Sequence, residues 1–416
     1  MSEFLTAALI VAADLVFDKR VILGGSNMKP IKVLYAEDYD EIFQLSEFAF
    51  QYKLSPEELQ KKKEEASRHT IWGWMDDNAK IAAKVHLIPL TCYLNEKPFA
   101  MGGISAVATW PEYRRQGMVK HLLHHALQYM RKNGQMISYL HPFSVPFYRK
   151  FGWELCFMER KCTIPMEGMR QNWEGRGYVR RISTDIPLLH AIYTGYAKKY
   201  NGMMTRDEKW WQQRILRQDF HIAAAYNDSN QPEGYIIYHV QKDKLEIVDF
   251  AYTSMNGWKL LLQFIANHDS MAAQVELTVP ENEPLSLLLE KPVLEQKIQS
   301  YFMARIVDIP AFLKEYSFAK GSHAVQLVVA DEFLPENSGS YVIEKRDTDT
   351  YVNFTKEGHI TAEDIHMKVQ QLTQILFGFA RPMELHRLGL IQGSEASVRE
   401  LEWLIPERQT YFADFF

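Results

Sequence analysis

The sequence predicts a protein of the α/β (α+β) class that is built from two or three domains. Its 416 residues are more than one ordinary hydrophobic core accommodates. Apolar residues make up 47% of the chain and charged residues 24%, which is typical of a globular protein. A strand, a turn and an amphipathic helix follow one another at 104–123, and the same order recurs at 245–265.

Charge and cysteine content exclude several classes of protein. The net charge of -5 argues against a general nucleic-acid binder, which needs a basic surface. The three cysteines, Cys92, Cys156 and Cys162, do not have the spacing of zinc ligands. Their odd, sparse pattern is typical of a reducing compartment. We therefore expect a cytoplasmic protein without a metal site.

The N-terminal residues 1–27 read as an extension that precedes the first domain. The apolar run Phe4 to Phe17 is too short to span a bilayer and contains Asp14. A signal peptide would begin with positive charge, whereas Glu3 is acidic. Gly24-Gly25 lies just upstream of Met28. A ribosome-binding site that is read as coding sequence would give such a glycine pair. We therefore expect no membrane span, and Met28 is the hypothetical native start.

The first domain begins with a strand from Ile31 and a helix over 38–50. A charged helix follows over 55–67, and its S-P-E-E start is a helix cap. Three strands are expected at 70–75, 80–90 and 99–109, joined by Asp-, Asn- and Pro-rich turns. A helix to about Lys132, a buried strand at 136–141 and a last strand through Lys161 complete the predicted order.

The turn between the third strand and the helix contains Arg114, Arg115, Gln116 and Gly117. The first N–H groups of the helix are unpaired there, and they point toward whatever lies before the helix. Together with the helix dipole and two arginines they form an anion site suited to phosphate. A solvated loop is the alternative, because loops often carry charge and glycine.

Strand, R-x-x-G turn and helix resemble the pyrophosphate loop of the Gcn5-related N-acetyltransferases (GNAT), and the element order is the one a GNAT domain requires. The resemblance implies acetyl-CoA as co-substrate. It also implies a splayed strand that binds the pantetheine arm and offers a donor to the thioester oxygen; a simple core strand is the alternative. The implied contacts are Val107, Ala108, Thr109, Arg115, Gln116, Gly117, Met118, Val119, Lys120, Phe143 and Ser144.

Tyr148 in VPFYRKFGW is the expected general acid. The family pattern places a tyrosine there, near the sulfur of CoA. A phenol with a pKa of about 10 is protonated at neutral pH and can pass its proton to a thiolate. A core aromatic is the alternative.

A second domain opens near Tyr178 and echoes the first, but its turn T-S-M-N-G-W lacks arginine. We interpret it as a degenerate GNAT domain, with convergent α/β patterning as the alternative. The third region has strands at 324–330 and 339–344 and helices at 365–377 and 397–404. The chain stops at TYFADFF, so we expect a docked terminus that buries Tyr411, Phe412, Phe415 and Phe416.

This organisation resembles the Eis (enhanced intracellular survival) family over nearly all of 28–416. The implied fold is two tandem GNAT-like acyltransferase domains, 28–165 and 166–303, and a sterol-carrier-like α+β domain, 304–416. In that family the carboxylate of the last residue is the general base, which falls on Phe416 here; the alternative is that Phe416 only anchors the tail. The family also implies a homo-oligomer, a hexamer.

We therefore expect an acetyl-CoA-dependent N-acetyltransferase that acts on a primary amine of the aminoglycoside, polyamine or lysine type. Ala106 replaces a phenylalanine of the mycobacterial relatives and Tyr52 replaces an acidic residue, so the regiochemistry does not transfer. His121, His124 and His125 read as a partly solvated helix face rather than metal ligands. The alternative function is a non-enzymatic lipid carrier or regulator.

Overall fold

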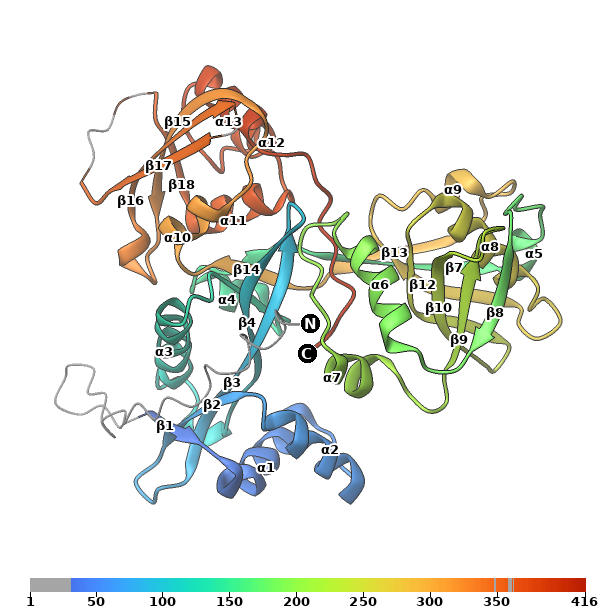
Figure 1. Cartoon of the computed structure of the whole chain (residues 1–416). Helices are drawn as coiled ribbons and strands as arrows, with labels where there is room; N and C mark the ends of the chain where they lie inside the picture. Colours follow the sequence, from blue (N-terminus) through green and yellow to red (C-terminus); the bar gives the residue numbers. More distant parts are fainter. Residues whose placement is uncertain (1–30, 348, 358–360, 362) are drawn as a thin grey trace, which may run out of the picture.

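The computed structural model describes residues 31–347, 349–357, 361 and 363–416. The expected extension at 1–27 and the proposed start at Met28 lie outside these residues. Figure 1 shows three bodies: the first domain around β1–β5, the second around β8–β12, and the third around β15–β18. The C-terminal segment leaves the third body and ends between the other two.

The first sheet has the order β1-β2-β3-β4-β5-β14-β6. Its strands are β1 (Ile31–Leu34), β2 (Thr70–Met75), β3 (Ile81–Leu94), β4 (Lys97–Thr109), β5 (Ile137–Leu140), β14 (Met303–Ile306) and β6 (Glu154–Leu155). The helices of this domain are α1 (Tyr39–Phe50), α2 (Pro56–Ala66), α3 (Met118–Lys132) and α4 (Val145–Arg149). Apolar side chains of α3 pack on one face of the sheet, and those of α1 pack on the other. The Ser55 capping box begins α2 as expected.

The second sheet has the order β13-β7-β12-β11-β10-β9-β8. Its strands are β7 (Met158–Pro165), β8 (Tyr178–Ile182), β9 (His221–Tyr226), β10 (Pro232–Gln241), β11 (Lys244–Tyr252), β12 (Gln274–Val279) and β13 (Glu295–Ser300). Its helices are α5 (Met166–Met169), α6 (Ile186–Ala197), α7 (Glu208–Trp210), α8 (Met255–Ala266) and α9 (Leu285–Leu288).

The two sheets exchange strands. β14 follows the second domain in the chain but pairs with β5 and β6 of the first sheet. β7 follows the first domain but pairs with β12 and β13 of the second sheet. The strand through Lys161, expected to complete the first domain, therefore lies in the second sheet. The expected domain limits stay a prediction.

The third domain is a four-stranded sheet with the order β17-β16-β15-β18. Its strands are β15 (Gly321–Ala330), β16 (Gly339–Asp347), β17 (Asp349–Thr355) and β18 (Ile365–Lys368), and its helices are α10 (Ile309–Glu315), α11 (Val369–Phe377), α12 (Pro382–Arg387) and α13 (Glu395–Leu404). The helix expected at 365–377 was wrong in its first turn. Residues 365–368 form β18, which pairs with β15, and the helix begins at Val369.

Candidate active site

The expected cofactor loop lies at the corner between β4 and α3. β4 pairs in parallel with β5 only from Met101 to Ile104, and it continues to Thr109 after β5 has ended. The two strands therefore separate beside Val107, Ala108 and Thr109. This is the splayed arrangement that the resemblance to GNAT domains implied for these residues.

A bulge interrupts β4 inside the splayed part. Lys84 of β3 pairs with Ala108, and His86 pairs with Ser105, so Ala106 and Val107 together face a single residue of β3. Ala106 has a φ of 48°, in the left-handed region. Such a bulge bends the strand and takes its backbone groups out of the ladder, which is a common device next to active sites.

The loop before α3 exposes the N-terminus of the helix. Arg115 and Gly117 have positive φ angles of 64° and 81°, and Gly117 is the N-cap residue. Within the described chain, no side chain caps α3 at this end. Arg114, Arg115, Gln116 and Lys120 are exposed beside it, whereas Met118 is buried. Unpaired N–H groups, the helix dipole and free cations fit a pyrophosphate.

Tyr148 lies on α4 and is buried, with 3% of its surface exposed. Its ring packs against Phe143 and Phe147, at centroid distances of 5.5 and 5.1 Å. It belongs to the same buried cluster as Ile104 of β4 and Met118 of α3. Burial raises the pKa of Tyr148 above its usual value, so the phenol is protonated at neutral pH.

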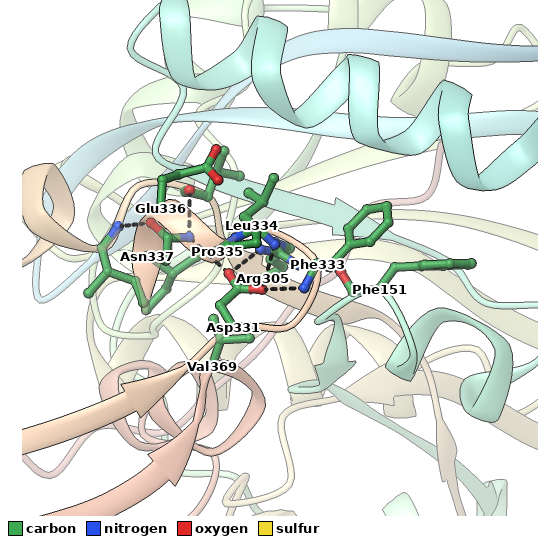
Figure 2. Close-up of polar contacts among 12 residues, drawn as sticks. Phe151, Arg305, Asp331, Phe333, Leu334, Pro335, Glu336, Asn337 and Val369 are labelled. Carbon is green, nitrogen blue, oxygen red and sulfur yellow. Dashed lines mark hydrogen bonds and ion pairs between the residues drawn. The ribbon is translucent and has the colours of Figure 1, made fainter. Parts of the chain in front are cut away.

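A buried ion pair between β14 of the first sheet and the third domain supports the turn that follows Tyr148 (Figure 2). Arg305 of β14 pairs with Asp331 and also donates to the carbonyl oxygen of Phe151. Asp331 further accepts from Asn337, at 2.9 Å. Gly152 follows with a φ of 87°, and a Cβ there would collide with the Arg305 guanidinium. Sequence reasoning missed this pair, because its members come from different domains.

The C-terminal tail is docked by a second buried ion pair. Arg206 contacts Asp414 at 3.0 Å and Asp249 at 2.8 Å, and its side chain is fully buried. Trp210 donates to Asp414 at 2.7 Å, and the Tyr301 hydroxyl donates to the Asp414 backbone carbonyl at 2.7 Å. The tail therefore has one fixed course over its last residues. Arg206 and Asp414 carry no motif that would have revealed them.

This anchor brings Phe416 to β4. A Cβ built on Gly103 would lie 2.7 Å from the Phe416 ring, so the ring rests directly on that glycine. Phe302 packs against Phe416 at 5.1 Å. Tyr411, Phe412 and Phe416 are buried as expected, but Phe415 is 56% exposed, so its expected burial was wrong. Its ring lies on the surface against His141, at 5.1 Å.

Phe416 and Tyr148 thus belong to the apolar clusters on the two faces of β4. Phe416 lies on Gly103, and Tyr148 belongs to the cluster around Ile104, which is the last residue paired with β5. The expected contacts Phe143 and Ser144 lie just before α4, and Phe143 is 75% exposed. The structure therefore places the expected cofactor loop at the end of β4, and the expected acid and terminal residue in the apolar clusters on its two faces.

The three histidines of α3 pack against aromatic rings. His125 lies 5.1 Å from Trp72, His121 lies 5.7 Å from Trp74, and His124 lies 5.5 Å from Phe333. Over the described ranges, no group of three or more possible metal ligands occurs. Among the same residues, no helix has the length and apolar character needed to cross a bilayer.

Comparison with known families and structures agrees with this geometry. Residues 30–156 and 202–306 each match a model of the acetyltransferase (GNAT) domain, and residues 309–413 match the sterol carrier protein domain. An uncharacterized N-acetyltransferase of Streptomyces griseus is 25% identical over 129 residues, which cover 28% of this chain. The match spans only 30% of the length of that relative.

Solved structures match over nearly the whole chain. A conserved protein of unknown function from Enterococcus faecalis V583, described as a probable N-acyltransferase, has a TM-score of 0.87 at 26% identity and covers 94% of this chain and 100% of its own. Eis1 from Mycobacterium abscessus has a TM-score of 0.79 at 17% identity, over 93% and 100%, which shows a shared fold. GNAT domains take acetyl-CoA as co-substrate, so of the two expected functions the enzyme is supported. The chain therefore contains two acetyltransferase (GNAT) domains followed by a sterol carrier protein domain.

Proposed function

We propose that this protein transfers the acetyl group of acetyl-CoA to a primary amine of the aminoglycoside, polyamine or lysine type. In this proposal Tyr148 is the general acid and the α-carboxylate of Phe416 is the general base. The observation that carries it is the docking of the chain end on β4. Phe416 lies on Gly103, beside the point where β4 and β5 separate.

The chemistry follows from these positions. The amine nitrogen attacks the thioester carbonyl carbon, and the carbon–sulfur bond breaks as the amide forms. The departing thiolate takes the proton of the Tyr148 hydroxyl. The amine gives up its proton to the Phe416 carboxylate, directly or through water. An α-carboxylate has a pKa of about 3.5 and is a weak base, so it acts chiefly by orienting the amine.

A hollow beside the loop suits the body of an amine substrate. It has a volume of about 440 Å³ and is lined by Gln44, Glu47, Phe48, Gln51, Tyr52, Lys53 and Trp110. Phe48 and Trp110 form an aromatic wall, with ring centroids 4.9 Å apart. Glu47 is the acidic group of this lining. This carboxylate already pairs with Lys53 at 3.5 Å, so it is the aromatic faces that would attract a cationic amine, which supports such an acceptor.

Tyr148→Phe tests the acid. The ring keeps its packing while the proton donor disappears, so kcat should fall by about 10²–10⁴-fold. A thiol-release assay with acetyl-CoA and a panel of amines measures this. The matched control is Tyr129→Phe on α3, which lies in the same cluster and should keep full activity. If Tyr148→Phe turned over at the wild-type rate, another group would supply the proton.

Extension of the chain by one glycine after Phe416 tests the base. The carboxylate then moves by about 3.5 Å or more while the Phe416 ring keeps its place on Gly103. We expect kcat to fall at least tenfold with an unchanged melting temperature. Amidation of the natural terminus by semisynthesis separates charge from length. Full activity in both forms would assign Phe416 to packing only.

A further inference from the structure

A buried lysine lies directly beneath the β4 bulge. Lys84 of β3 is 0% exposed and pairs with Ala108. Residues paired across an antiparallel ladder point to the same face. His86 pairs with Ser105, and Ile88 pairs with Gly103, so Lys84 shares the face on which Phe416 rests.

The Lys84 ammonium has no carboxylate partner among the described residues. Its Nζ donates to the carbonyl oxygen of Ala106 at 3.0 Å and lies 3.2 Å from Nε2 of His86. Buried lysines are normally paired with an acid, because an isolated charge in the core is strongly disfavoured. A lysine that is kept without one, under an irregular strand, points to a role beyond packing.

The hydrogen bond from Lys84 to the Ala106 carbonyl also fixes the direction of the next N–H group, which is that of Val107. A trans peptide is planar, so its C=O and N–H point in opposite directions. With the Ala106 carbonyl held toward Lys84, the Val107 N–H is directed away from Lys84. The bulge removes Val107 from the register with β3, and β5 pairs with β4 only up to Ile104. This donor is therefore available to a ligand between the splayed strands.

We propose that Lys84 is a positioning residue whose ammonium group holds and polarises the Ala106–Val107 peptide, so that the Val107 N–H donates more strongly to the thioester oxygen. A hydrogen bond to one end of a peptide strengthens the bond made by its other end. The effect grows as negative charge develops on that oxygen during attack. This inference rests on the proposed acetyl transfer at β4.

The protonation of Lys84 gives the inference a measurable signature. Burial lowers the pKa of Lys84 to about 7, so it titrates near neutral pH. His86 and His69 are the nearest titratable groups, and burial also lowers the pKa of each. Beyond them stand Arg68, Lys62 and Arg214, and Glu65 of α2 pairs with the last two. His69 and His86 are uncharged at neutral pH, which leaves Lys84 as the group that titrates in this cluster.

The test compares kcat of the wild type with kcat of Lys84→Met and Lys84→Gln between about pH 6 and pH 9. At each pH the kcat of the wild type is divided by the kcat of the variant, so the pH dependence of every group that titrates alike in both proteins cancels. For Lys84→Met we expect a ratio of about ten at the acid end, less than the roughly 10²–10³ typical of losing such a donor outright. The ratio should fall as Lys84 loses its proton. Lys84→Gln, a neutral donor, should give a smaller ratio that also falls with pH.

A second measurement does not depend on activity. In the protein labelled with ¹³C at lysine Cε, the signal that is absent from Lys84→Met should titrate with a midpoint near pH 7. Lys84→Met removes an unpaired buried charge, so it should fold at least as stably as the wild type. An active wild type whose ratio to Lys84→Met is close to one at every pH, or whose ratio stays constant while the Lys84 signal titrates, would overturn the inference. An inactive wild type with a midpoint near 7 would instead contradict the proposed function.

Discussion

The two GNAT domains place a strand and a helix at equivalent corners but treat the N-terminus of the helix differently. In both domains the strand after the hairpin separates from its parallel neighbour: β4 after Ile104 and β11 after Ile247. Both also have an irregular register with the preceding strand. The shared irregularities support the internal repetition that the sequence suggested.

The lengths of the two turns differ. In the first domain, residues 110–117 separate β4 from α3, whereas in the second only Thr253 and Ser254 separate β11 from α8. The second turn was expected over T-S-M-N-G-W, residues 253–258, but the helix begins at Met255 because Ser254 caps it. The Ser254 hydroxyl accepts from the Gly257 N–H at 3.0 Å. An N–H group in the first turn of α8 is therefore paired with the helix's own cap residue.

The Glu233 carboxylate also contacts residues at the N-terminus of α8. Trp110 N–H donates to the Ala82 carbonyl, and Thr253 N–H donates to the Glu233 carbonyl, so Ala82 and Glu233 occupy equivalent places. The Glu233 carboxylate accepts from Ser254 at 2.7 Å and from Asn256 at 2.8 Å. The second corner thus places the Glu233 carboxylate beside the N-terminus of α8. At the equivalent place in the first corner, Ala82 has only a methyl group. We therefore expect the second domain not to bind CoA at this corner.

Charge reversal in the first corner should have the largest effect. Arg114→Glu with Arg115→Glu places carboxylates where phosphate is expected, and each reversal should weaken CoA binding by about 1.4 kcal/mol, or roughly 100-fold together. Titration calorimetry with CoA measures the Kd. Met255→Glu is the matched control, since it adds a carboxylate to the first turn of α8. Equal Kd values for the wild type and the double variant would move the cofactor site away from this loop.

Two glycine substitutions should separate binding from stability. A Cβ on Gly117 meets only His121, at 3.9 Å, but its φ of 81° is unfavourable for alanine by roughly 1 kcal/mol. Gly117→Ala should therefore weaken CoA binding several-fold and lower the melting temperature slightly. A Cβ on Gly257 would lie 2.5 Å from the Glu233 carbonyl oxygen. Gly257→Ala should lower the melting temperature more and leave the Kd for CoA unchanged; the reverse pattern would contradict the assignment of the two corners.

Local patterns in the sequence predicted much of the first domain. The Ser55 cap, the strand–turn–helix order and the R-x-x-G loop depend on residues close together in the chain. The structure confirms the cap and the element order, and the role of the loop stays a prediction. Phe416 could be predicted only through the family resemblance, because nothing local to TYFADFF indicates β4.

Features that join distant segments could not be predicted. The exchange of β7 and β14 joins strands that are far apart in the chain, so the residues of either strand alone do not reveal it. Arg206–Asp414 and Arg305–Asp331 are ordinary charged residues until the fold buries them together. Lys84 reads as the polar position of an alternating strand. Its burial beneath a bulge, with no acidic partner among the residues that the structure describes, is what distinguishes it.

Glu233→Gln should have the smallest effect and tests the internal anion directly. Hydrogen bonds from Asn256, Ser254 and Asn227 outweigh the effect of burial and lower the pKa of Glu233 below its usual value of 4.5. A carboxyl whose pKa is lower in the folded state stabilises the protein above the unfolded pKa, and that stabilisation is lost as pH falls through the folded pKa. Thermal unfolding of the wild type and Glu233→Gln should therefore differ by a small, constant amount at neutral pH, and the difference should shrink below about pH 4.5. The mirror change Ala82→Ser is the control, because it adds no charge to the first corner. A difference that stayed constant down to acid pH would mean that Glu233 acts only through its shape, and that the second helix N-terminus is closed by Ser254 alone.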